Sequence, residues 1–249
     1  AYRLVFPFLP TISRGLGVTT GTLGTALAIR DLVEMSSPLL GKVIDKRGTN
    51  QAMVVGALGL GMAAALQGAS SGLILFVFAL VLTAISKNSF DIGSSAWAGA
   101  SVPYAHRSRA IGMIETTWAL SFVIGMPIAS VLIRAGTWRT PFIVISILCV
   151  VVGIIFNHRL PPNPPISSRE KGSSLSLTAK KVICAMIALG AGHMMMLVTF
   201  ATFLEDEHNV STSGLGFIAV IIGLALLLVL GCGRSDAKKL SEELDARNK

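Results

Sequence analysis

Long apolar runs separated by short polar segments fill most of the chain. A transmembrane helix needs about 20 apolar residues, and in lipid the backbone groups of a spanning segment must bond within that segment. The pattern therefore predicts an all-α integral membrane protein. A shorter run at residues 1–17 is interpreted as the second half of a truncated first helix. The runs long enough to span lie at about residues 18–41, 51–69, 72–99, 110–133, 139–157, 180–204 and 214–233.

A polar segment at residues 158–179 separates the first six helices from the rest. It begins with prolines at 161, 162, 164 and 165 and continues with serine, glycine and charged residues, a composition typical of linkers. The expected organisation is an N-terminal six-helix lobe at 1–157, a linker at 158–179 and helices 7 and 8 at 180–233. A polar tail follows at 234–249.

Composition agrees with a membrane protein and excludes a soluble enzyme. Hydrophobic residues make up 52% of the chain and charged residues 14%, with a mean hydropathy of +0.70, whereas soluble domains carry about 25% charged residues. The three cysteines (Cys149, Cys184 and Cys232) lie in apolar runs without metal-ligand spacing. We find no nucleophile–base constellation and no phosphate-binding loop, so we expect no enzymatic activity, no metal and no cofactor.

The net charge of +8 has a topological explanation. Aromatic residues are only 6% and no basic stripe is interleaved with them, so nucleic acid is excluded as a partner. With residues 1–17 running outward, segments 42–50, 100–109, 158–181 and the tail from Arg234 hold 15 Lys or Arg, against three in the opposite loops. Cytoplasmic loops carry such an excess. The linker and the C-terminal tail are therefore expected to be cytoplasmic.

Ionisable residues inside apolar runs are the main functional signal. Each costs about 2.5–3.5 kcal/mol at the centre of a spanning helix, so such residues face one another or a water-filled cavity. The third and sixth runs have none between their ends. Helices 1, 2, 4 and 5 are therefore expected to surround a substrate or ion pathway. Its candidate residues are Arg30, Asp31, Glu34, Lys87, Asp91 and Glu115.

Spacing suggests how these charges pair. Lys87 and Asp91 are one turn apart, as are Arg30 and Glu34, so each pair can neutralise itself locally without any functional role. Asp31 lies about 100° around the helix from Arg30, and Lys87 is a candidate partner for it.

Glu115 lies about 9 Å along its helix from Arg109, by helix rise. Its candidate partners are Lys87 and a backbone group. A carboxylate in a low-dielectric site can also hold a proton, which leaves proton coupling open.

Prolines and glycines predict interrupted and closely packed helices. Pro7 and Pro10 are expected to break the first helix, Pro38 the second and Pro127 the fifth. The third helix carries glycines that are consistent with close helix packing: Gly56, Gly59, Gly61 and Gly68.

The segment after the second helix, Gly41-Lys42-Val43-Ile44-Asp45-Lys46-Arg47-Gly48, resembles the signature of the major facilitator superfamily between helices 2 and 3. The usual trailing basic pair is replaced by Thr49 and Asn50. Arg109-Ala110-Ile111-Gly112 and Trp138-Arg139-Thr140-Pro141-Phe142 are similar to segments that open helices 5 and 6 in members of that family. The glycines are expected to allow tight helix ends.

The resemblance implies a helical bundle of two six-helix lobes that works by alternating access, with helices 1 and 4 at the cavity and helices 3 and 6 outside. This chain is expected to hold one lobe plus two helices of the second, with helices 9–12 or a partner chain missing. Secondary active transport of small solutes is the implied function. The alternative is a non-transporting membrane subunit, or a truncated relic, that packs against partner chains. The residues implied at the inner gate are Gly41, Asp45, Arg47, Gly48 and Arg109.

Overall fold

The computed structural model describes residues 4–160 and 177–208, together with positions 210, 211, 214, 215, 217, 218, 220–222, 224 and 225. Every regular element in these ranges is a helix, which confirms the all-α prediction. In chain order they are α1 (Leu9–Leu16), α2 (Thr20–Glu34), α3 (Ser37–Arg47), α4 (Thr49–Ala69), α5 (Leu73–Ser101), α6 (Tyr104–Leu120), the π-helix η1 (Ser121–Gly125), α7 (Met126–Ala135), α8 (Thr140–Arg159) and α9 (Leu177–His208).

Four of the described helices are long and apolar enough to cross a membrane: Thr49–Ala69, Leu73–Ser101, Arg109–Ala135 and Thr140–Arg159. The last of these, α8, exposes a row of large aliphatic side chains, among them Ile143, Ile147 and Ile154. Such a surface is stable against lipid and not against water. The chain is thus an integral, multi-pass membrane protein.

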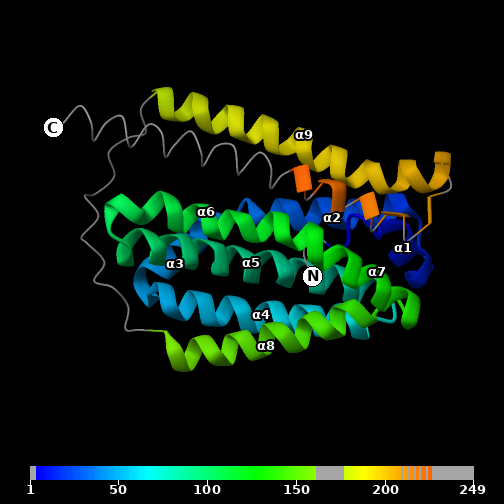
Figure 1. Cartoon of the computed structure of the whole chain (residues 1–249), viewed down its shortest axis with the longest axis horizontal. Helices are drawn as coiled ribbons and strands as arrows, with labels where there is room; N and C mark the ends of the chain where they lie inside the picture. Colours follow the sequence, from blue (N-terminus) through cyan, green and yellow to red (C-terminus); the bar gives the residue numbers. More distant parts are fainter. Residues whose placement is uncertain are drawn as a thin grey trace.

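The helix α4 lies between α5 and α8 and packs along both (Figure 1). Glycines allow this close approach. A Cβ atom built at Gly61 would lie 2.8 Å from Cγ2 of Val150 on α8, and one at Gly59 would lie 2.4 Å from Oγ of Ser86 on α5. The predicted packing role of the α4 glycines is therefore confirmed.

Two connections meet at one end of the bundle, which we call the Ser70 end: the α4–α5 turn and the α7–α8 turn. Arg139 donates hydrogen bonds from Nε and Nη2 to the carbonyl of Ser70, at 3.3 and 2.9 Å. Beneath this contact, the ring of Phe76 packs edge-on against Trp138 and Phe142, with centroids 6.0 and 6.2 Å apart. The aromatic cluster fixes α5 and α8 relative to one another.

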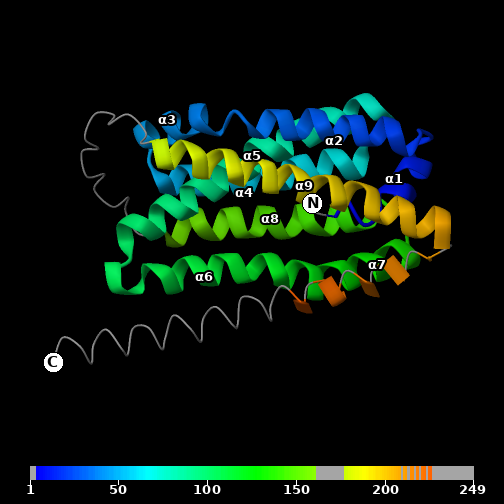
Figure 2. The same ribbon diagram turned by 90° about the horizontal axis from the view of Figure 1, so that it is seen from above.

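The helix α9 lies along the side of the bundle that carries α1 and α2 (Figures 1 and 2). Its packing contact with α1 lies at the Ser70 end, where Arg14 donates a hydrogen bond to Oε1 of Glu205. This contact joins residues 191 positions apart in the chain.

The predicted break at Pro38 is confirmed, whereas Pro127 distorts its helix without ending it and Pro10 lies in the first turn of α1. The second run divides at Met35 and Ser36 into α2 and α3, just before Pro38, and α1 begins at Leu9 with Pro10 in its first turn. The fifth run contains the π-helical turn η1 directly before Pro127. A proline has no N–H to continue the ladder, so the backbone rearranges in the preceding turn.

Several predicted boundaries are wrong. Residues 42–50 are helical except for Gly48, and α6 begins at Tyr104 instead of near residue 110. α8 continues to Arg159 and α9 begins at Leu177, so the linker is shorter than predicted at both ends. A helix can extend into polar sequence, because water or side chains can satisfy the backbone N–H and C=O groups at its ends. The stretch 161–176, the second half of helix 8 and the tail 234–249 lie outside the described residues.

Candidate functional site

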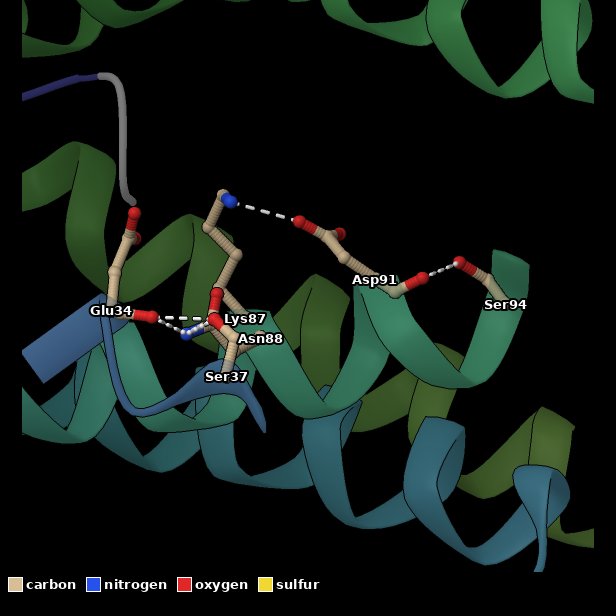
Figure 3. A network of polar contacts seen from close by, with 6 residues as sticks. All are labelled: Glu34, Ser37, Lys87, Asn88, Asp91 and Ser94. Atoms are coloured by element: carbon tan, nitrogen blue, oxygen red, sulfur yellow. Dashed lines mark hydrogen bonds and ion pairs between the residues drawn. The ribbon is translucent and has the colours of Figure 1, made fainter. Parts of the chain in front are cut away.

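The ion pair between Lys87 and Asp91 is the centre of the candidate site (Figure 3). Nζ of Lys87 lies 2.8 Å from Oδ2 of Asp91, one turn further along α5. The lysine side chain is 17% exposed and the aspartate side chain 41%. The predicted pairing within α5 is confirmed. Because α5 is long and apolar enough to span a membrane, these charges need either each other or water.

The helix α2 brings a third ionisable group to this pair. Glu34, the last residue of α2, is half-buried, and its carboxylate lies on the same side of α5 as the Lys87 ammonium group (Figure 3). Asn88 joins the two helices by donating from Nδ2 to the backbone carbonyl of Glu34 and to Oγ of Ser37, each at 3.1 Å. Three predicted pathway residues, Glu34, Lys87 and Asp91, therefore gather where α2 meets α5.

Arg30 and Asp31 form a separate pair. Nη2 of Arg30 lies 2.7 Å from Oδ1 of Asp31, and Nε of the same guanidinium lies 3.0 Å from that oxygen. The arginine side chain is completely buried, and its guanidinium carbon lies 4.9 Å from the ring centroid of Phe6.

The expectation that Asp31 pairs with Lys87 is therefore wrong. Neighbouring helical side chains point about 100° apart, but the long arginine side chain reaches back to its neighbour while its guanidinium packs against the ring of Phe6.

Glu115 does not join these groups. It is exposed on α6, and within the described ranges its carboxylate makes no hydrogen bond or ion pair. The expectation that it meets Lys87 is wrong, because Lys87 lies against Asp91. Glu115 nevertheless belongs to a helix that packs against α5.

The residues of the Gly41–Gly48 segment lie on and directly after α3. Gly41 is inside α3 and does not end a helix, contrary to the expectation, and a Cβ added there would meet nothing within 4 Å. Gly48 alone separates α3 from α4, with φ 95° and ψ 153°. Asp45 and Arg47 are exposed on the last turn of α3, and Arg109 is exposed on α6. The helix α3 and the beginning of α6, which carry or adjoin these residues, lie at the end of the bundle opposite the α4–α5 turn (Figure 1).

Sequence reasoning missed the polar residues that link helices. Asn88 is one of these residues. Gln67 is another: it is buried in α4, and its Nε2 donates a hydrogen bond to Oγ1 of Thr83 on α5, at 3.1 Å. Uncharged polar residues within apolar runs were the available signal. No three His, Cys, Asp or Glu side chains in the described part of the chain are placed to hold a metal ion.

The sequence matches the family described as Major Facilitator Superfamily over residues 1–242. It is similar to two proteins of Bacillus subtilis (strain 168). With "Uncharacterized MFS-type transporter YwfA" it shares 21% identity over 140 residues, which is 56% of this chain and 34% of that protein. With "Multidrug resistance protein 2" it shares 25% over 174 residues, 69% of this chain and 43% of the relative.

A third relative comes from Cupriavidus necator (strain ATCC 17699 / DSM 428 / KCTC 22496 / NCIMB 10442 / H16 / Stanier 337). The chain is 28% identical to its "Probable sulfoacetate transporter SauU" over 171 residues, 67% of this chain and 39% of that protein. The chain thus spans less than half of the length of each of these relatives.

Proposed function

The chain belongs to the major facilitator superfamily, a family of transporters and not of enzymes, and we propose that it serves secondary active transport of small solutes by alternating access. The observation that carries this proposal is the meeting of Glu34, Lys87 and Asp91 between α2 and α5. Ionisable side chains at the depth of spanning helices mark substrate or ion pathways. Arg30 and Asp31 supply a second charge pair on α2, in which the arginine side chain is completely buried and the aspartate side chain is 34% exposed.

We propose that protons drive the transport, with Asp91 and Glu115 as the groups that carry them. Both side chains are exposed, which a proton carrier needs. While Asp91 is ionised it holds Lys87 at 2.8 Å. Protonation of Asp91 removes its charge, and the ammonium group then turns towards the carboxylate of Glu34 on α2. Uptake of one proton in this way changes the attraction between α5 and α2.

The inner gate is proposed to consist of Gly41, Asp45, Arg47, Gly48 and Arg109. Support comes from the place of α3 and the beginning of α6 at the end of the bundle opposite the α4–α5 turn, which the excess of Lys and Arg assigns to the cytoplasm. Gly48 alone joins α3 to α4, so the direction of α3 relative to α4 is set at this residue.

The test uses the complete protein in liposomes. A thermal-shift screen of solute classes selects the probe, beginning with sulfoacetate and with a cationic drug-like dye such as ethidium, because relatives are named for sulfoacetate and for multidrug resistance. Transport is then measured with and without a pH gradient for the wild type, Asp91→Asn and Glu115→Gln. Asp206→Asn, an exposed acid on α9, is the control.

We expect the pH gradient to lose its effect in Asp91→Asn or Glu115→Gln and to keep it in Asp206→Asn. An unchanged pH dependence in both site variants contradicts proton coupling. A protein that neither binds nor moves any solute class supports the alternative, a non-transporting membrane subunit.

A further inference from the structure

The break between α2 and α3 leaves the carbonyl group of Glu34 without its helical donor. In a continuous α-helix the carbonyl of Glu34 accepts from the N–H group of residue 38, and residue 38 is a proline, which has none. The two residues after Glu34 form tighter, three-residue hydrogen bonds. The N–H group of Met35 donates to the carbonyl of Leu32 at 3.2 Å, and that of Ser36 donates to the carbonyl of Val33 at 3.0 Å. The carbonyl of Glu34 must therefore find donors among side chains.

Two side chains supply those donors. Oγ of Ser37 donates to the carbonyl of Glu34 from within the break itself. Nδ2 of Asn88 donates to the same carbonyl from α5, at 3.1 Å, and also reaches Oγ of Ser37 at 3.1 Å (Figure 3). Asn88 is only 8% exposed, so water does not replace it readily. A buried carbonyl without a partner is expensive, most of all in a membrane.

We propose that Asn88 is a positioning residue that replaces the missing proline N–H and fixes the α2–α3 break to α5. Asn88 directly follows Lys87, so the amide and the ion pair with Asp91 share one turn of α5. Any shift of this turn reaches α3 through the Asn88 amide. α3 in turn carries the Gly41–Gly48 segment. The mechanical claim stands on the hydrogen bonds alone, whereas its consequence for transport rests on the proposed function.

A double-mutant cycle separates this role from ordinary packing. Pro38→Ala restores an N–H group at the position from which it reaches the carbonyl of Glu34. Asn88→Ala is therefore expected to lower the midpoint of thermal unfolding in the wild-type background and to have little effect in Pro38→Ala. Ser94→Ala is the matched control, because Oγ of Ser94 bonds only the carbonyl of Asp91 on its own helix. It should behave alike in both backgrounds.

The position of α3 is measured directly with a cysteine at Lys42, an exposed residue of α3. In Lys42→Cys, with the three native cysteines replaced by serine, Asn88→Ala is expected to change the rate of maleimide labelling by about fivefold, the ratio that one ordinary hydrogen bond gives. Adding Pro38→Ala should restore the original rate. Equal effects of Asn88→Ala with and without Pro38→Ala, in both measurements, overturn the proposal.

Neither measurement needs transport, so the two proposals fail separately. If the wild type moves no solute, the function fails and the labelling still decides the role of Asn88. If the wild type moves a probe, Asn88→Ala should lower kcat about fivefold with KM unchanged, since Asn88 holds a helix and does not touch the solute. A raised KM with unchanged kcat assigns Asn88 to binding and overturns its positioning role.

Discussion

Gly56 of α4 and Phe90 of α5 leave no room for a side chain between their helices. A Cβ atom at Gly56 would lie 2.7 Å from the backbone nitrogen of Phe90 and 2.8 Å from the carbonyl oxygen of Ser86. Backbone atoms cannot swing aside as a flexible side chain does, so α4 and α5 would have to separate. Gly56 therefore allows α4 to pack closely against α5, the helix that carries Lys87 and Asp91.

Gly56→Ala is therefore expected to destabilise the protein by about 1–3 kcal/mol, the usual effect of overpacking. Thermal unfolding in detergent measures the loss. The control is Gly99→Ala on α5, where an added Cβ meets nothing within 4 Å. It should raise the stability by about 0.5–1 kcal/mol through helix propensity. Equal shifts in the two variants contradict close packing of α4 on α5.

The two glycines of the Gly41–Gly48 segment should respond oppositely to alanine. Gly48 has φ 95° with ψ 153°, a conformation that side chains strongly disfavour, so Gly48→Ala is expected to cost about 1–3 kcal/mol. Gly41 lies inside α3 with open space around it, so Gly41→Ala should be neutral or slightly stabilising. Unfolding midpoints of the two variants test the difference. A loss of stability in Gly41→Ala equal to that in Gly48→Ala contradicts this account.

The Lys87–Asp91 pair predicts non-additive stability effects. Lys87→Gln removes the ammonium group that pairs with Asp91, and Asp91→Asn removes the carboxylate that pairs with Lys87. The double variant removes both charges. The sum of the stability losses in the two single variants should therefore exceed the loss in the double variant by about 1 kcal/mol, as for other residues in direct contact. Lys87→Gln combined with Ser94→Ala serves as the control, since Ser94 bonds a backbone carbonyl instead. Additive losses for Lys87 and Asp91 would show that the pair is not maintained in the membrane.

Helix positions and the Lys87–Asp91 pair were predictable because both depend on local rules. Apolar runs set the spans, and residues four apart on a helix lie on one face. Proline breaks were predictable for the same reason. Partner choice between helices was not. Arg30 pairs with Asp31, and Phe6, 24 positions earlier in the chain, packs against its guanidinium.

The positions of the helix ends could not be predicted from the sequence pattern either. Polarity near residues 42–50 and 100–109 indicated loops, yet charged residues at the surface end of a helix are as stable as in a loop. In the first segment only Gly48, with its positive φ, lies outside a helix, and in the second only Val102 and Pro103 do. Asn88 was missed because a neutral amide in an apolar run carries no sign of its partner. Its role follows from Pro38, which is 50 positions away in the chain.

The contact between Arg14 and Glu205 predicts how firmly α9 is held to the first six helices. Arg14 lies in the last turn of α1 at the Ser70 end, and its side chain is 62% exposed, whereas that of Glu205 is 20% exposed. Oε2 of Glu205 is buried and makes no hydrogen bond, so Arg14 is the described partner of this carboxylate. An exposed pair of this kind contributes about 0.2–1 kcal/mol and weakens with salt.

Arg14→Glu replaces this attraction with repulsion, so the backbone amides of α9 should exchange hydrogen for deuterium about twofold to fivefold faster, in line with an exposed ion pair. Glu205→Arg alone should act in the same direction, and the combined charge reversal should restore slow exchange. Glu207→Arg, an exposed acid two residues further along α9, controls for net charge and should leave the exchange rate nearly unchanged. High salt should reduce the difference between the wild type and Arg14→Glu, because it screens both the attraction and the repulsion. If the combined reversal exchanges as fast as either single variant, α9 is held to α1 by packing alone and the ion pair contributes nothing.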